Sequence, residues 1–160
     1  MHLIYDVAHN IAKVEEHKVN GEKKKVLVHR KGATRSFAAG SPLIPKDYRD
    51  LGQPVLIPGS MGTASWVLLG HPNSYELSFG TTAHGAGRMM SRSAAVRQYG
   101  DKVRKIMEER GVYIETPSWK GAAEEVPQAY KDVDEVVETS HALKIATKVV
   151  RLVPLGVIKG

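Results

Sequence analysis

Residues 31–63 are rich in glycine and proline, which limits this segment to short helices or strands joined by turns. Between residues 31 and 63 the turn formers are Gly32, Gly40, Pro42, Pro45, Gly52, Pro54, Pro58, Gly59 and Gly62. Proline removes a backbone donor and glycine weakens a regular element through its backbone entropy, so no long helix or strand is expected there. We expect short strands in loop-rich structure, where binding sites tend to be built.

The remaining sequence predicts a hairpin, two main helices and further short strands. Apolar residues at helical spacing, with Ser91 as a cap and Gly100 as a weak point, predict a helix over residues 91–110 that ends at Gly111. A second helix is expected at residues 132–143. The lysine-rich residues 21–25 are expected to form the hairpin turn. The expected strands lie at residues 12–19, 26–30, 54–57, 65–69 and 112–114, with the apolar tail 149–158 as strand or buried coil.

This mixed order of strands and helices favours an α+β fold over a doubly wound sheet. The length of 160 residues is that of one domain and is sufficient to bury a core. We found no internal repeat and no low-complexity tract. The sequence therefore predicts a single domain over residues 1–160 with no internal boundary.

The composition is that of a globular protein with a basic surplus. The formal net charge of +6 favours a polyanionic ligand such as RNA or a nucleoside triphosphate. Cysteine is absent, which excludes disulfides, thiolate metal ligands and cysteine nucleophiles within this chain. No apolar run approaches the roughly 18–20 residues of a membrane helix, and the N-terminus lacks the pattern of a signal peptide. We therefore expect a cytoplasmic protein without a membrane partner.

One histidine lies in a glycine-rich run whose chemistry suits a phosphate ligand. The run reads Gly80-Thr81-Thr82-Ala83-His84-Gly85-Ala86-Gly87-Arg88. Glycines let a ligand approach the backbone, and a glycine-rich turn that enters a helix offers N–H groups to a phosphate. On a helix, Arg88 and Arg92 would share one face and could clamp phosphoryl oxygens, while the imidazole of His84 could attack the α-phosphorus of GTP. On local chemistry alone, a tight turn followed by an exposed helix face is the commoner interpretation of such a run, and it stays open.

Two other segments carry polar groups with less specific patterns. The run Pro58-Gly59-Ser60-Met61-Gly62-Thr63-Ala64-Ser65 offers backbone N–H groups and hydroxyls. It could cradle a phosphate or a purine, or it could be an ordinary turn; it is not a Walker A loop. His9 beside Asn10 could ligate a metal and contact a nucleotide, but metal sites need three or more ligands and no spacing pattern unites His9 with His17 or His29.

Together these segments resemble the C-terminal third of the RtcB family of RNA ligases. The resemblance is carried by His9-Asn10, by His29-Arg30-Lys31-Gly32-Ala33-Thr34-Arg35, by residues 54–65 and 78–92, and by Pro154-Leu155-Gly156-Val157-Ile158-Lys159-Gly160. It covers nearly the whole chain, and its motifs are long and ordered. The resemblance implies an RtcB-like α+β fold around a deep metal-lined cleft, of which this chain would form the C-terminal portion with a loop-rich nucleotide site.

The resemblance also implies an activity and a set of site residues. The family seals RNA carrying a 2′,3′-cyclic phosphate or 3′-phosphate to RNA carrying a 5′-hydroxyl, in tRNA splicing and RNA repair, and it uses GTP and Mn²⁺. By this resemblance His84 is guanylylated, His9 is a metal ligand and Lys159 contacts guanine. The implied nucleotide contacts are Asn10, Pro58, Gly59, Ser60, Met61, Ser65, Gly85, Ala86 and Gly87, with Tyr130 near the nucleotide.

The family's other metal ligands lie upstream of the region that matches. They are a cysteine, an aspartate and two histidines, and this chain does not contain them. The expected partners are therefore RNA (tRNA halves), GTP, and either a separate N-terminal RtcB-like chain or further copies in a homo-oligomer. Two alternatives stay open: a non-catalytic remnant that binds a nucleotide or RNA, and a phosphotransfer or phosphohydrolase activity through a phosphohistidine.

Overall fold

A computed structural model describes residues 2–159, which group into two compact units. Unit 1 contains residues 2–57, Trp66–Gly85 and Val137–Val150, and unit 2 contains Pro58–Ser65, Ala86–Val136 and residues 151–159. The expectation of a single domain without a boundary stays a prediction.

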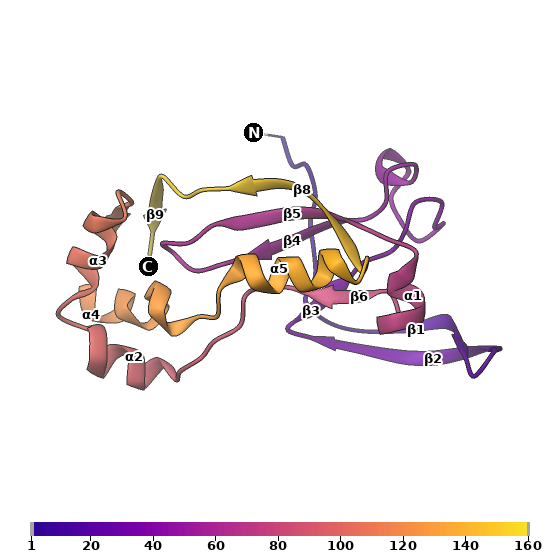
Figure 1. The fold of residues 1–160 in the computed structure, drawn as a ribbon, viewed down its shortest axis with the longest axis horizontal. Coiled ribbons are helices and arrows are strands. Elements are labelled where there is room, and N and C mark those ends of the chain that lie inside the picture. Colours follow the sequence, from indigo (N-terminus) through magenta and orange to yellow (C-terminus); the bar gives the residue numbers. More distant parts are fainter. Residues whose placement is uncertain (1, 160) are drawn as a thin grey trace. The chain divides into compact units, whose positions relative to one another are not determined.

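The fold mixes helices with several small sheets (Figure 1), as the sequence predicted at the level of class. The strands are β1 Asn10–Val19, β2 Glu22–Lys31, β3 Ala33–Arg35, β4 Pro54–Pro58, β5 Ser65–Gly70, β6 Thr81–Ala83, β7 Tyr113–Glu115, β8 Ala146–Leu152 and β9 Gly156–Ile158. The helices are α1 Asn73–Ser78, α2 Arg92–Tyr99, α3 Val103–Glu109, α4 Trp119–Ala122 and α5 Val133–Ala142, with 3₁₀ turns η1 Lys46–Tyr48, η2 Ala123–Glu125 and η3 Pro127–Ala129.

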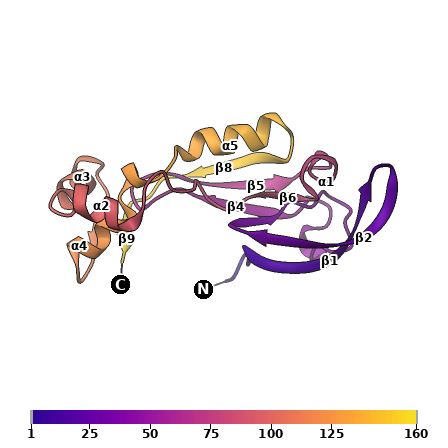
Figure 2. The same cartoon turned by 90° about the horizontal axis from the view of Figure 1, so that it is seen from below.

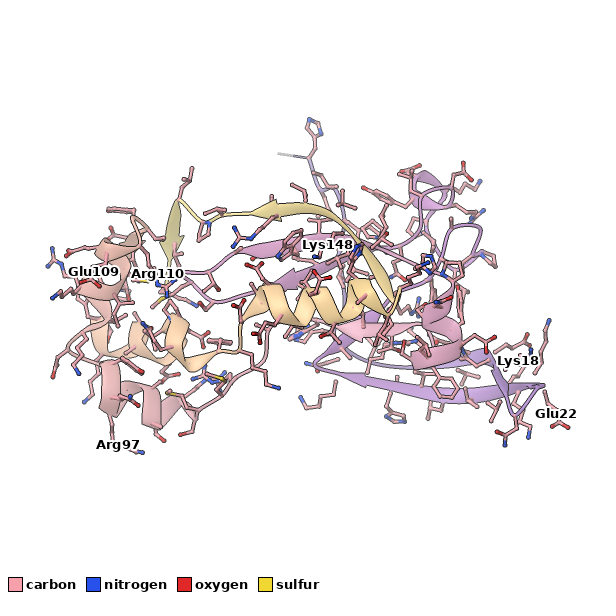
Figure 3. All side chains as sticks on the ribbon, viewed as in Figure 1. Lys18, Glu22, Arg97, Glu109, Arg110 and Lys148 are labelled. Atoms are coloured by element: carbon pink, nitrogen blue, oxygen red, sulfur yellow. The ribbon has the colours of Figure 1, made fainter. Side chains whose placement is uncertain are left out.

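Strands β1 and β2 form an antiparallel hairpin in unit 1 (Figure 2). Its turn consists of Asn20 and Gly21, whose φ angles of 52° and 85° suit a two-residue hairpin turn of the type that Asn-Gly favours. Lys18 and Glu22 lie beside this turn (Figure 3). The expected turn at residues 21–25 is therefore wrong: the lysines after Glu22 belong to β2, because Asn-Gly reverses the chain in two residues.

The remaining strands of unit 1 form a two-stranded sheet, β3-β6, and a three-stranded sheet in the order β4-β5-β8. Val55, Ile57 and Leu68 are completely buried, whereas Leu56 between the first two is exposed. This alternation in β4 is the period-2 pattern of a strand with one covered face. Strands β4 and β5 confirm the strands expected at residues 54–57 and 65–69. Helix α5, also expected, lies beside this sheet (Figures 1 and 2) and buries Val137 completely.

Unit 2 contains α2, α3 and α4 and the parallel strands β7 and β9. The hydroxyl of Ser91 accepts a hydrogen bond from the N–H of Ala94 at 3.1 Å, which confirms the expected cap of α2. The helix ends at Gly100, so the segment 91–110 forms two helices, α2 and α3. Gly111, with φ of 67°, follows α3 where a helix-ending glycine was expected.

The tail 149–158 contains the end of β8 and all of β9, which confirms the strand expectation. Most of its apolar side chains are nevertheless exposed. Leu155 and Ile158 are each 86% exposed, so the expectation of a buried coil is wrong.

Among the described residues, no helix combines the length and the apolar character needed to cross a membrane.

Candidate active site

Two short strands bring His9 and His84 together in unit 1. His9 directly precedes β1, and its carbonyl accepts a hydrogen bond from the N–H of Gly32 at 3.0 Å, which extends the hairpin ladder by one residue. The next residue, Ala33, begins β3 and pairs with Ala83 of β6, the residue before His84. The two imidazole rings consequently lie with their centroids 4.2 Å apart and their planes inclined by 39°.

This placement favours the neutral form of His84. His84 is half-buried and His9 is exposed. Burial lowers the pKa of His84 from its ordinary value of 6.5, and the positive charge of a protonated His9 lowers it further. A neutral imidazole has an unprotonated ring nitrogen with a free electron pair, which a nucleophile requires.

The described residues do not form a complete metal site. In residues 2–159 no group of three or more His, Cys, Asp or Glu side chains lies close enough to hold a metal ion. His9 could supply one nitrogen ligand, but a catalytic metal needs more ligands than this pair of histidines. The expectation that His9 is a ligand therefore stays a prediction.

The loop of residues 58–65, in unit 2, is braced by its own polar groups. The Oγ1 of Thr63 accepts a hydrogen bond from the N–H of Ser60 at 2.7 Å and lies 3.0 Å from the Ser60 hydroxyl. A Cβ on Gly59 would lie 2.3 Å from the same Oγ1, so a larger residue cannot take its place. Met61 is 6% exposed and packs in the core of unit 2, so its side chain is not available to a nucleotide.

A backbone hydrogen bond joins the glycine-rich run to this loop. The N–H of Ala86 donates to the carbonyl of Pro58 at 3.0 Å, which brings two of the expected nucleotide segments together at the point where β4 ends. Ser65, at the other end of the loop, begins β5 and is half-buried. Gly87 has φ of 77°, and among the described residues no atom would lie within 4 Å of a Cβ placed there.

Arg88 lies before α2, so the expectation that Arg88 and Arg92 share one helical face is wrong. The left-handed Gly87 interrupts any helical path, and the cap at Ser91 starts the helix only at Arg92. On the helix, Arg92 pairs with Glu124, with 3.4 Å between Nε and the carboxylate. The two guanidinium groups therefore have different partners and do not form one clamp.

Arg88 instead belongs to a polar group with Tyr130 and Glu125. One Nη of Arg88 donates to the Tyr130 hydroxyl at 3.0 Å and lies 3.5 Å from the Glu125 carboxylate. The hydroxyl of Tyr130 donates to Glu125, and burial and this carboxylate together raise the pKa of Tyr130. The other Nη of Arg88 is buried and has no hydrogen-bond partner within the described residues, so it is an unsatisfied donor.

Lys159 follows β9 and lines a cavity of unit 2. Its N–H donates to the carbonyl of Glu115 at 2.9 Å. The cavity has a volume of about 410 Å³, within the range of small-molecule sites. Its other lining residues are Arg92, Thr116, Ser118, Gly121, Ala122, Glu124 and Glu125.

Sequence reasoning missed a buried charged cluster on the hairpin. Arg30 is 2% exposed and binds both carboxylate oxygens of Glu15, at 2.9 and 2.7 Å. His17 lies 3.1 Å from the same carboxylate. Burial acts to raise the pKa of Glu15, but the hydrogen bonds from Arg30 and His17 and the nearby positive charges outweigh it and lower the pKa. The pattern of β1 gives no signal for this cluster, because the apolar Val14 lies on the opposite face and would predict that face, not the one with Glu15 and His17, to be buried.

Comparison with known proteins identifies relatives along the whole chain. The sequence model of the family described as tRNA-splicing ligase RtcB matches residues 1–160. Proteins with that same description are similar in Thermococcus kodakarensis and Pyrococcus abyssi, each 58% identical over 161 residues. A third, from Nanoarchaeum equitans, is 50% identical over 162 residues.

The match covers all of this chain but only part of each relative. The chain spans 33% of the Thermococcus protein, 18% of the Pyrococcus protein and 34% of the Nanoarchaeum protein. It corresponds to the C-terminal part of these proteins.

Proposed function

Because the chain belongs to the RtcB family of tRNA-splicing ligases, we propose that it is the C-terminal part of a GTP- and Mn²⁺-dependent RNA ligase whose nucleophile is His84. The ligase joins RNA ends that carry a 2′,3′-cyclic phosphate or 3′-phosphate to ends that carry a 5′-hydroxyl. The observation that carries the proposal is the half-buried ring of His84, 4.2 Å from that of His9 and with a lowered pKa.

The first chemical step uses the free electron pair of the neutral His84 ring. A ring nitrogen attacks the α-phosphorus of GTP, a nitrogen–phosphorus bond forms, and the bond to the oxygen that bridges to the β-phosphate breaks. Pyrophosphate leaves, and the other ring nitrogen gives up its proton to solvent. GMP then passes to the RNA 3′-phosphate, which restores His84, and the 5′-hydroxyl displaces GMP as the RNA bond forms.

We assign the nucleotide contacts to segments with open or small residues. Gly85 and Gly87 let the guanylate approach the backbone. Lys159 contacts guanine, and Asn10 contacts the nucleotide. The other proposed contacts come from Pro58, Gly59, Ser60, the Met61 backbone, Ser65 and Ala86.

The metal and the RNA require more than the residues of this chain. A divalent metal would offset the negative charge that develops on the α-phosphate. The described residues do not complete its coordination, so His9 is proposed as one ligand and the longer protein supplies the others. The net charge of +6 is consistent with an RNA substrate.

The proposal predicts covalent labelling at His84. The chain is incubated with Mn²⁺ and GTP radiolabelled at its α-phosphate, together with the remaining N-terminal part as it occurs in the Thermococcus relative. We expect label on the chain that is stable to base and labile to acid, as a phosphoramidate is, and its loss in His84→Ala. Lys159→Ala should weaken labelling at low GTP concentration, and the chain without the N-terminal part should not be labelled.

A matched control and two contrary outcomes make this test decisive. His29→Ala removes an exposed histidine of β2 and should label as the unchanged chain does. Absence of label in the reconstituted pair, with GTP still bound, would instead favour a non-catalytic nucleotide-binding remnant. Labelling of the isolated chain would contradict the need for the missing part.

A further inference from the structure

The guanidinium group of Arg30 connects the hairpin to the segment that leads to His84. Its Nη groups are held by Glu15, and its Nε donates to the Thr81 hydroxyl at 2.9 Å. One of the Nη groups also donates to the carbonyl of Phe79 at 2.9 Å. The Arg30 side chain is completely buried, so these contacts form where water does not compete for the donors.

The turn that Arg30 contacts has a strained backbone. Phe79 and the following Gly80 have φ angles of 53° and 61°, in the left-handed region. A Cβ on Gly80 would lie 2.6 Å from the Phe37 ring, and the N–H of Gly80 donates to the carbonyl of Ser74 at 2.8 Å. Non-glycine residues keep such a conformation only where surrounding contacts enforce it, and the bond from Arg30 to Phe79 is one of these contacts.

Both histidines of the candidate site are carried by the segments that Arg30 joins. His9 directly precedes β1 of the hairpin, and His84 follows Thr81 by three residues along β6. We infer that Arg30 is a positioning residue that, through the hydroxyl of Thr81, holds His84 beside His9. The inference rests on the proposed function in taking His84 as the nucleophile.

The chemistry of arginine suits this position better than that of lysine. A buried cation needs a compensating anion, and Glu15 satisfies both Nη groups of Arg30. The planar guanidinium then directs its Nε in a fixed direction, toward Thr81. The single ammonium group of a lysine could not bind a carboxylate through two parallel hydrogen bonds and, at the same time, donate a third in a fixed direction to the Thr81 hydroxyl.

The decisive variant is Thr81→Val, because it removes the connection and leaves the buried Arg30–Glu15 pair in place. Thr81 accepts from Arg30 and its hydroxyl donates to the carbonyl of Phe79 at 3.2 Å; valine can do neither. The readout is the nuclear Overhauser cross-peak between the imidazole rings of His9 and His84, in the 160-residue chain with labelled histidine. We expect the cross-peak in the unchanged chain and its loss in Thr81→Val.

Two further variants separate positioning from general stability. Thr81→Ser keeps the hydroxyl and should restore the cross-peak. Thr82→Val, at the next position of β6, removes a buried hydroxyl that lies 3.1 Å from the hydroxyl of Ser140 in α5. It should lower the melting temperature as much as Thr81→Val does and still retain the cross-peak.

The outcomes distinguish this inference from the proposed function. Retention of the cross-peak in Thr81→Val, or its equal loss in both valine variants, would overturn the positioning role whatever the ligase does. In the reconstituted protein, Thr81→Val should lower the rate of guanylylation about 100-fold, the cost of a displacement of roughly 1 Å, with little change in the GTP concentration at half-maximal rate. If the cross-peak behaves as expected and no variant is ever guanylylated, the positioning role stands and the proposed function fails.

Discussion

At the scale of single residues, the two histidines share one electrostatic constraint. Two imidazole rings with centroids 4.2 Å apart repel each other when both are positively charged, and His84 is also partly withdrawn from water. Because a lowered pKa means that the proton leaves at lower pH, His84 loses its proton at a lower pH than an ordinary histidine does. The pH range over which the proposed nucleophile is neutral therefore extends further toward acid.

This predicts the titration of His84 and its dependence on His9. Followed by nuclear magnetic resonance, His84 should titrate below 6.5. In His9→Gln the pKa should rise but remain below 6.5, because burial is the larger cause and persists. His29→Gln is the control and should change nothing. A His84 that titrates above 6.5 in the unchanged chain would contradict the structure of the site.

At the scale of elements, the turn between α1 and β6 tolerates only glycine at position 80. We predict that Gly80→Ala lowers the free energy of unfolding by about 2–5 kcal/mol, from a left-handed alanine and from its clash with Phe37. Gly40→Ala is the matched control: its φ of 84° is also left-handed, but within the described residues no atom lies within 4 Å of the added Cβ. Gly40→Ala should lower the free energy of unfolding by only about 1–2 kcal/mol. If denaturant unfolding gives the same loss for Gly80→Ala and Gly40→Ala, the clash with Phe37 contributes nothing and the prediction is refuted.

At the scale of the whole molecule, the chain has several exposed apolar side chains and is one third as long as its Thermococcus relative. Leu3, Leu155 and Ile158 are 82%, 86% and 86% exposed, and the chain spans 33% of that relative. We predict that the isolated chain self-associates as its concentration rises, and that the remaining part of the relative converts it into a one-to-one complex. Sedimentation velocity measures both.

The double variant Leu155→Ser with Ile158→Ser tests the cause of this association. It should reduce self-association because it removes exposed apolar surface without opening a core. A chain that remains monomeric at every concentration, and that does not bind the remaining part, would refute the prediction.

Local patterns in the sequence predicted the elements whose signals are local. The cap at Ser91, the interruption at Gly100 and the strand at residues 54–57 depend on a few neighbouring residues, and the structure confirmed them. That strand was expected to be buried, but its Leu56 is exposed, because only one face of the strand is covered. The hairpin turn was misplaced because the lysines were given more weight than Asn20-Gly21, whose backbone preference decides where the chain reverses. The family was identified from ordered motifs, and the matches along the whole chain confirmed it.

By itself, then, the sequence determined the mixed α and β class, the family and the candidate histidine, since each depends on residue types and their order. Only the tertiary structure decided that Gly32 and Ala33 bring His9 beside His84, that Arg88 pairs with Tyr130 rather than sharing a face with Arg92, and that Glu15 and Arg30 form a buried pair. Such contacts join residues far apart in the chain. The free energy of these contacts depends on distant partner residues and on burial, and a short segment of the sequence contains neither.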